Sequence, residues 1–291
     1  MSNYVLENDI LTIIISSFGA ELQSIYNKEN KLEYLWQADP EFWAKKSPVL
    51  FPIVGGLKNN QYNYLGKNYS LNRHGFAREK EFNVIQVSST IIQFVFESND
   101  ETLKVYPFHF KLTVEYSINN NQLFCSYFIE NKGNDEMYFS IGAHPAFKVP
   151  LTESSSYEDW FLEFNKIEDA GIYPLTNEGL LEVNPIPFLK TTNQLQLKKE
   201  LFYKDALVFK NLQSNKISIK GNSSKHGLTM QFYDFKYFGI WSAKNANFVC
   251  LEPWCGIADA EDTNSELTSK EGIHELKVNN NFKRTWSVEV F

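Results

Sequence analysis

Hydrophobic and polar residues alternate with a period of two along much of the chain. In the segment 110–118 (FKLTVEYSI) every second side chain from Phe110 to Ile118 is apolar, and the side chains between them are polar or charged. Successive side chains of a strand point to opposite faces, so this pattern predicts a strand with one buried face. Three Asn at 119–121 predict a turn into a second strand at 122–131. The same alternation appears in the segments 91–98, 216–221, 227–235 and 285–291.

Helical periodicity is scarce by comparison. Only residues 39–46 and a piece around 264–276 predict a turn or two of helix. The segments between the predicted strands carry Asn, Gly and Asp, which favour turns. No Pro/Gly/Ser-rich linker, composition shift or repeat divides the chain. We therefore predict an all-β fold, with residues 1–291 forming one large antiparallel β-sandwich or barrel as a single domain.

Composition narrows the class of protein. Hydrophobic residues make up 43% and charged residues 22% of the 291 residues, enough apolar surface for a large core, which excludes disorder as the main state. The formal net charge is -7 and no block of Lys and Arg stands out, so we expect no nucleic-acid partner. Aromatic residues reach 15%, which favours strands and stacking surfaces.

Cysteines and the N-terminal segment bear on the compartment. Cys125, Cys250 and Cys255 are odd in number and form no CxxC pair, so we expect no disulfide framework. Glu7 and Asp9 precede only a short apolar run, without the basic region of a signal peptide. No stretch approaches the ~18 apolar residues that a membrane-spanning helix needs. We expect a cytoplasmic protein with no membrane partner.

Several catalytic motifs are missing from the sequence. The five His are His74, His109, His144, His226 and His274. They form no HxH, no HExxH and no Cys/His cluster at ligand spacing, so we expect no catalytic metal and no metal-dependent cupin isomerase. GxSxG and the phosphate-binding GxxxxGK are also absent from the sequence.

Three segments carry candidate chemistry. Residues 72–78 place two Arg and a His around a Gly, residues 141–147 place His144 between small residues and a Pro, and residues 248–254 place Glu252 directly after an apolar strand. A carboxylate in apolar surroundings is unfavourable unless it is hydrogen-bonded or used in function. Each segment alone also has a structural interpretation: a capped turn, a His bonded to backbone, or a Glu paired with an Arg.

Together these segments resemble a known family. HGFAR (74–78), GAHPAF (142–147) and LEPW (251–254), in this order on an all-β chain, resemble the galactose mutarotase-like (aldose 1-epimerase) superfamily, in its mutarotase-related branch with HGFAR. The resemblance extends from FGAELQSI through PVLFPIVG and KDALVF to GIADAED, nearly the whole chain. It implies a β-supersandwich with a sugar site in a groove on one sheet. It also implies a mutarotase that interconverts the α and β anomers of a hexose without a cofactor.

The resemblance also implies roles for particular residues. His144 matches the general acid that protonates the ring oxygen, and Glu252 matches the general base that takes the proton of the anomeric hydroxyl. His74 and Arg78 fall at positions that contact the substrate. Asp205 resembles the acid that holds sugar hydroxyls. Opening a hemiacetal requires a base at O1 and an acid at O5, so two groups in opposite protonation states must flank one ring.

Two tryptophans and one departure from the family pattern leave the substrate and the activity open. Trp254 and Trp241 would stack on the apolar face of a sugar or serve as core residues. Relatives often carry Arg after FPIVG, whereas this chain has Gly56. A cluster of Arg73, Arg78 and Lys58 near the groove would grip the phosphate of a hexose 6-phosphate. A non-catalytic sugar-binding sandwich also fits the sequence, and a glycosidase with two flanking carboxylates fits it less well.

Overall fold

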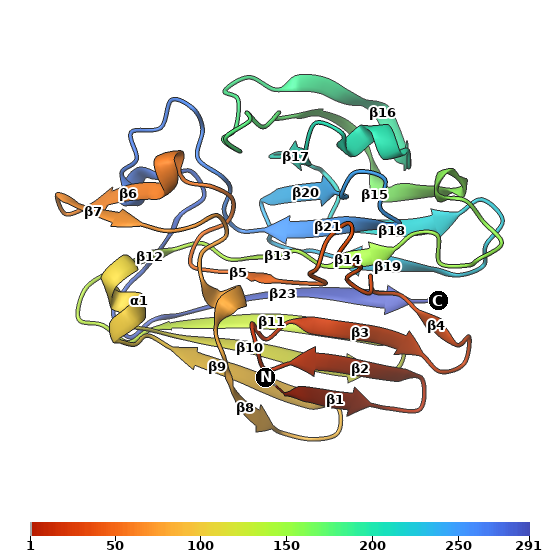
Figure 1. The fold of residues 1–291 in the computed structure, drawn as a ribbon, viewed down its shortest axis with the longest axis horizontal. Coiled ribbons are helices and arrows are strands. Elements are labelled where there is room, and N and C mark those ends of the chain that lie inside the picture. The colour runs from red at the N-terminus through yellow and green to blue at the C-terminus, as the bar shows by residue number, and fades with distance from the viewer. Residues whose placement is uncertain (1) are drawn as a thin grey trace.

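The protein is built almost entirely from antiparallel strands. A computed structural model describes residues 2–291. Its largest element is a nine-stranded sheet that runs from β8 to β16 across the molecule (Figure 1). In spatial order its strands are β16 (Ile186–Gln196), β15 (Trp160–Ile172), β18 (Lys216–Gly221), β19 (Gly227–Gln231), β23 (Asn281–Val290), β11 (Gln122–Asn131), β10 (Phe110–Asn119), β9 (Ile91–Glu97) and β8 (Asn83–Gln86). The all-β prediction is confirmed.

Two further sheets lie in front of this sheet in Figure 1. A six-stranded sheet contains β17 (Leu207–Phe209), β20 (Tyr237–Trp241), β21 (Phe248–Trp254), β13 (Gly142–Ala143) and β5 (Val49–Leu50), with β14 (Ala146–Lys148) paired to β21. A four-stranded sheet contains β1 (Asn3–Glu7), β2 (Leu11–Ser16), β3 (Leu22–Asn27) and β4 (Leu32–Glu33). The small pairs are β6 (Gln61–Tyr64) with β7 (Lys67–Ser70), and β12 (Met137–Phe139) with β22 (His274–Leu276).

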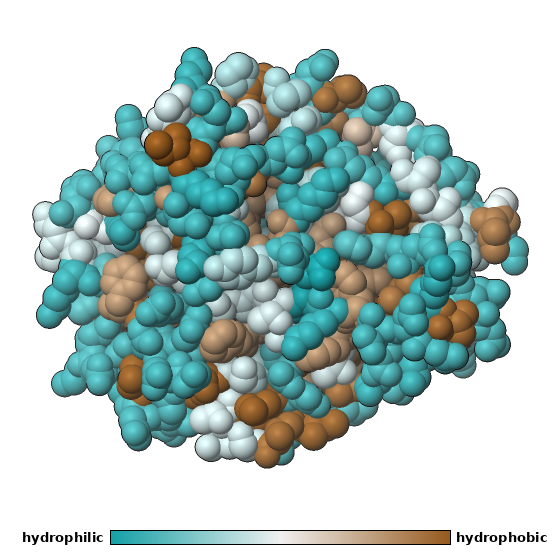
Figure 2. Space-filling view, turned by 180° about the vertical axis from the view of Figure 1, so that it is seen from behind, coloured by the Kyte–Doolittle hydropathy of each residue, from teal (hydrophilic) through white to brown (hydrophobic). Residues whose placement is uncertain are grey.

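The main core lies between these layers. Alternating side chains of β10, among them Leu112 and Val114, are buried together with Ile240 of β20 and Leu251 of β21 in one hydrophobic cluster. The face of the molecule that is turned away from the viewer in Figure 1 carries mainly hydrophilic side chains, with scattered hydrophobic ones (Figure 2). This division follows from the period-two alternation, because one set of side chains in each strand faces the core and the other faces water.

The helical expectations were only partly right. Residues 39–46 form a single turn, closed by a hydrogen bond of 2.9 Å from the Trp43 N–H to the Asp39 carbonyl. The piece around 264–276 contains one 3-10 turn, η5 (Leu267–Ser269), and then β22. The α-helix of the described chain, α1 (Asp100–Val105), was not predicted. The other 3-10 turns are η1 (Lys58–Asn60), η2 (Ala77–Glu79), η3 (Tyr157–Asp159) and η4 (Lys199–Phe202).

Strand β21 differs from the alternating strands. All seven of its residues are buried, because β20 flanks it on one edge, β13 and β14 flank the other, and side chains cover both faces. Cys125, Cys250 and Cys255 are buried and have free thiols. Across residues 2–291, no helix has the length and apolar character needed to span a bilayer.

Candidate active site

The six-stranded sheet forms part of the wall of a cavity of about 480 Å³. This volume falls in the range of roughly 300–1,000 Å³ that is typical of small-molecule sites. All six residues predicted for the site line this cavity, although they come from well-separated segments of the chain. They are His74, Arg78, His144, Asp205, Glu252 and Trp254.

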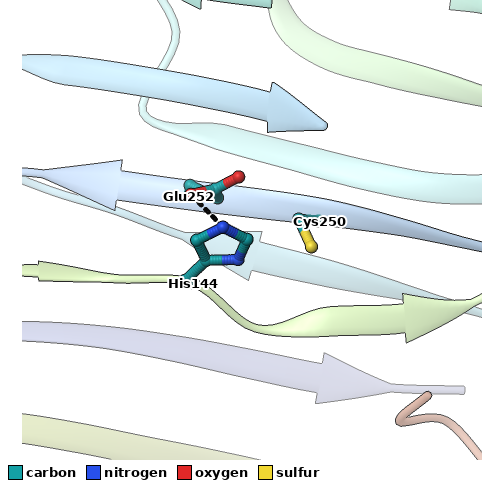
Figure 3. Close-up of side chains that lie close together, drawn as sticks. All are labelled: His144, Cys250 and Glu252. Carbon is teal, nitrogen blue, oxygen red and sulfur yellow. Dashed lines mark ion pairs between the residues drawn. The ribbon is translucent and has the colours of Figure 1, made fainter. Parts of the chain in front are cut away.

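His144 and Glu252 face one another across the sheet. His144 lies in the link between β13 and β14, and Glu252 lies on β21, whose neighbour β14 brings the link alongside (Figure 3). The distance from His144 Nε2 to Glu252 Oε2 is 3.2 Å. The two groups are not aligned as a hydrogen bond, so Oε2 is a buried oxygen without a hydrogen-bond partner. Only 1% of Glu252 is exposed.

Burial shifts the pKa values of this pair in opposite directions. Desolvation lowers the pKa of His144 to about 3, and the positive charges of Arg78 and Arg73 add to the effect. Desolvation and then the charge of Asp205 raise the pKa of Glu252 well above its usual value, against the opposing charge of Arg73. Both shifts favour the uncharged form. The pair is therefore biased towards a neutral imidazole beside a protonated carboxyl, an arrangement in which one proton lies between the two facing groups.

His74 is held as a hydrogen-bond donor. Its Nδ1 accepts a hydrogen bond of 3.1 Å from the Gly55 N–H, and its backbone N–H donates to the Gly55 carbonyl at 2.9 Å. Burial, and then the neighbouring His144, lower the pKa of His74 well below its usual value, so the ring is neutral. Because Nδ1 accepts, the ring proton sits on Nε2. The rings of His74 and His144 meet edge to face with centroids 5.8 Å apart.

Arginines line one side of the cavity. Arg78 Nη2 donates to the Arg73 carbonyl at 2.9 Å, whereas Arg78 Nε is buried without a hydrogen-bond partner and lies 3.7 Å from a Glu79 carboxylate oxygen. Arg73 also lines the cavity and its Nη2 donates to the Gly179 carbonyl at 3.4 Å. Arg78 therefore keeps unused donor capacity at the cavity.

The prediction that Lys58 joins Arg73 and Arg78 at the cavity was wrong. The Lys58 side chain does not line the cavity, because its Nζ donates to the Glu261 carbonyl at 2.6 Å. Lys204 lines the cavity in its place. Its position beside Asp205 in the segment that precedes β17 is readable from the sequence, but nothing in the local pattern distinguishes it from a surface lysine.

Asp205 enters the cavity from a strained segment. Its φ of 147° is unusual for a residue with a side chain, and its Oδ1 accepts a hydrogen bond of 2.7 Å from the Ala206 N–H. Backbone strain of this kind persists where the surrounding structure enforces it, and it is concentrated at functional sites. The carboxylate is close enough to Glu252 for its charge to raise the pKa of that residue.

Trp254 lies between two glycines of the neighbouring strands. A Cβ on Gly142 of β13 would come within 2.6 Å of the indole, and a Cβ on Gly239 of β20 would come within 2.4 Å. Both distances are shorter than any ordinary carbon contact, so the ring fits only because these positions are glycine. The indole Nε1 is buried without a hydrogen-bond partner.

Trp43 was missed by the sequence analysis. Its ring stacks on His144 with centroids 4.9 Å apart and an interplanar angle of 29°, and Trp241 meets the same imidazole edge to face at 5.6 Å. Trp43 lies in the single turn at 39–43, where the sequence predicted only a short helix. The available signal was an aromatic pair between charged residues in a segment without strand alternation.

Folding also brings Cys250 beside the acid and base. Ligand atoms of His144, Cys250 and Glu252 lie within 4.8 Å of one another. Cys250 and Glu252 are two residues apart on β21 and therefore point to the same side (Figure 3). His144 is more than 100 residues away in sequence, so ligand spacing in the sequence could not indicate this cluster.

Comparisons with known proteins bear on the family of the chain. A sequence model described as aldose 1-epimerase matches residues 2–267. Protein LacX of Lactococcus lactis subsp. lactis is 34% identical over 296 residues, covering 98% of each chain.

Two solved structures match over the whole fold. The galactose mutarotase related enzyme of Lactobacillus acidophilus is 36% identical, with a TM-score of 0.95 over 100% of this chain and 97% of that one. A galactose mutarotase-like protein of Lactobacillus casei is 29% identical, with a TM-score of 0.94 over 100% of both chains. The sequence resemblance is confirmed, and the chain belongs to the aldose 1-epimerase family.

Proposed function

We propose that the protein is a mutarotase that interconverts the α and β anomers of a free hexose. The observation that carries this proposal is the pair of His144 Nε2 and Glu252 Oε2, 3.2 Å apart in the wall of a cavity of about 480 Å³. The family supports an isomerase acting on a sugar. The pair supplies one acid and one base, the two groups that ring opening requires.

The proposed reaction uses the one proton of the pair. When the sugar O1–H donates to Glu252 Oε2, this hydrogen bond favours the carboxylate, and the proton of the pair moves to His144. Glu252 then takes the O1 proton, the C1–O1 bond becomes a carbonyl as the C1–O5 bond breaks, and His144 gives its proton to O5. Rotation about C1–C2 followed by the reverse steps closes the ring on the other face, and the pair regains its starting protons.

The remaining polar groups would orient the sugar. His74 Nε2–H and Arg78 Nε offer donors, and the Asp205 carboxylate offers acceptors for hydroxyl groups. Trp254 offers an aromatic surface for the apolar face of a ring. Holding the substrate in a reactive geometry supplies a large part of the rate acceleration in such unimolecular reactions.

Polarimetry of freshly dissolved α-D-glucose and α-D-galactose tests this proposal. We expect the protein to accelerate mutarotation, and the substitutions His144→Asn and Glu252→Gln to lower kcat by about 10²–10⁴-fold each, the usual contribution of a positioned acid or base. Thermal unfolding of each variant controls for folding. A loss smaller than tenfold in a folded variant would remove that residue from the mechanism.

A second candidate substrate is a hexose 6-phosphate. Arg73, Arg78 and Lys204 line the same cavity, and guanidinium groups bind phosphate oxygens in pairs. If this candidate holds, Arg73→Gln should lower kcat/KM for α-glucose 6-phosphate by about 10–100-fold, the value of a charged hydrogen bond, and leave free glucose unaffected. Equal losses on both substrates would argue against a phosphate site.

The third candidate is a sugar-binding protein without catalysis. A pure binder has no need of an acid and a base in contact, and Glu252 is buried at an energetic cost that binding alone does not require. Hexose binding in calorimetry without any acceleration of mutarotation would favour this candidate over the first two.

A further inference from the structure

One side of the acid–base pair is occupied by a thiol. His144, Cys250 and Glu252 each offer a ligand atom, and these atoms lie within 4.8 Å of one another (Figure 3). Cys250 is completely buried and belongs to a small apolar cluster with Phe248 and Ala146. The proposed reaction has no use for this thiol.

The chemistry of the three groups is that of a metal site. Glu252 is 1% exposed and its Oε2 has no hydrogen-bond partner, so this oxygen has an unused lone pair inside the protein. The imidazole of His144 can bind a metal ion through a ring nitrogen, and its Nε2 lies 3.2 Å from Glu252 Oε2. Sulfur, nitrogen and oxygen ligands together suit Zn²⁺ and similar borderline ions, whereas Mg²⁺ and Ca²⁺ require oxygen ligands.

We propose that His144, Cys250 and Glu252 form a binding site for Zn²⁺, open on one side to the cavity. Three protein ligands with a fourth position left open is a common arrangement for this ion. Ligands that bind Zn²⁺ at about 2.0–2.3 Å lie roughly 3.3–3.8 Å apart in a tetrahedron. The His144–Glu252 distance of 3.2 Å is close to this spacing, and all three ligand atoms lie within 4.8 Å of one another.

The bound ion would act as an inhibitor. Zn²⁺ displaces the thiol proton and the carboxyl proton, two in total, and binds the thiolate, the carboxylate and the neutral imidazole. It thereby occupies both groups that the reaction needs. The positive charges of Arg73 and Arg78 oppose the ion and limit its affinity. Inhibition rests on the proposed mutarotase function, but metal binding rests on the geometry alone.

Cobalt substitution tests binding without reference to activity. Co²⁺ reports a bound thiolate by a ligand-to-metal absorption band in the near ultraviolet and reports tetrahedral geometry by its visible bands. We expect both sets of bands when Co²⁺ is titrated into the protein, and Zn²⁺ in excess should remove them. In Cys250→Ala the near-ultraviolet band should be lost, because the sulfur ligand is gone. Cys255→Ala, which removes a buried thiol outside the cluster, should keep it.

Activity measurements then test inhibition. Zn²⁺ should slow mutarotation by the native protein, and a chelator should restore the rate. Cys250 does not line the cavity, so Cys250→Ala should keep the native rate while the inhibition constant for Zn²⁺ rises at least about tenfold. Saturating hexose should weaken inhibition, because sugar and ion compete for Glu252.

Two results would overturn the proposal. One is the absence of a thiolate-to-cobalt band in the native protein. The other is a band that persists in Cys250→Ala and disappears in Cys255→Ala, which would place the ion elsewhere. If the band appears as expected and no hexose is turned over, the metal site stands and the proposed mutarotase function fails.

Discussion

Two buried carboxylates close to the cavity have opposite surroundings. Asp259 is 4% exposed, and its Oδ1 accepts the Lys270 ammonium at 2.6 Å while its Oδ2 accepts the Lys58 N–H at 3.0 Å. Glu252 is 1% exposed, and its Oε2 lies 3.2 Å from the neutral His144 without forming an aligned hydrogen bond. The first carboxylate has its hydrogen bonds satisfied by the protein. The second retains a buried oxygen without a hydrogen-bond partner in the protein.

Asp259, the carboxylate with complete hydrogen bonding, stabilises the loop that holds His74. Asp259 donates its N–H to the Gly56 carbonyl at 2.9 Å, and Gly55 in turn holds both backbone and ring of His74. Hydrogen bonds from and to Asp259 thus hold the loop at 55–58 against the segment that follows β21. The carboxylate that supports the loop is thus fully paired, whereas the carboxylate proposed as the base is not, and such unpaired buried groups are concentrated at functional sites.

The largest expected effect follows from removing the partner of Asp259. Lys270→Met leaves a buried carboxylate without its cation and should lower the free energy of unfolding by about 3–5 kcal/mol, measured by urea denaturation. The double variant Asp259→Asn with Lys270→Met should recover part of this loss, because no charge remains buried. Equal losses in the single and double variants would mean that the pair acts by packing and not by charge.

The next effect concerns Glu252 and pH. Folding raises the pKa of Glu252, so its contribution to stability is present below about 4.5 and is lost as pH rises through the folded pKa. Glu252→Gln has no carboxyl to titrate and therefore does not lose this stability. The unfolding temperature of the variant, relative to that of the native protein, should therefore rise as pH increases from 4.5 to 8. A constant difference across this range would show that the carboxyl is not held in the protonated form.

His144 should give the opposite dependence. Folding lowers the pKa of His144 to about 3, so the native protein loses stability as pH falls from 6.5 towards 3. His144→Asn should be less sensitive to acid over this window, as measured by thermal unfolding at a series of pH values. His109→Asn, at an exposed strand end, is the matched control and should follow the native curve. Identical acid sensitivity in all three proteins would contradict the assignment of a neutral His144.

The smallest effect concerns the ring that covers His144. Trp43 stacks on the imidazole at 4.9 Å and would stabilise its protonated form during the reaction by about 0.5–2 kcal/mol. Trp43→Ala should therefore lower kcat by about 2–30-fold on mutarotation, and Trp43→Phe should retain most of the rate. A change in KM alone would assign Trp43 to sugar binding instead.

Much of the fold was readable from the sequence, because alternation is strict where one face is buried. The strands at 110–118 and 122–131 appear as β10 and β11, and the turn between them places Asn120 at a φ of 50°. Strand β16 was missed because most of its residues are exposed and its pairing with β15 is interrupted by register shifts. Without a buried face there is no alternation to detect.

Helix α1 has a local signal in the sequence that does not depend on hydrophobic periodicity. The Asn99 side chain accepts hydrogen bonds from the N–H groups of Glu101 and Thr102, and Thr102 Oγ1 accepts one from the Asn99 N–H. This capping box is visible in the sequence as Asn followed three residues later by Thr, with acids between them. A helix of six residues is too short to display a hydrophobic period, so its cap is the better predictor.

The site was found by motifs and could not be found by spacing. His144 and Glu252 stand in recognisable segments, but their contact depends on the pairing of β14 with β21. The Lys270–Asp259 pair and the stacking of Trp43 on His144 carry no local pattern at all. Such contacts join residues whose neighbours in sequence look like ordinary surface or core.

The packing of the Trp254 ring between Gly142 and Gly239 has a consequence for how sugar preference could change over evolution. Because Gly142 and Gly239 admit the indole by the absence of a methyl group on each side, replacing either with alanine would push the ring out of its plane. In the ladders of the six-stranded sheet Gly142 pairs with Trp254, and Gly239 pairs with Glu252, the proposed base. Relatives could thus reshape the room for a substrate by single substitutions at these two strand positions, which lie next to the proposed acid and base.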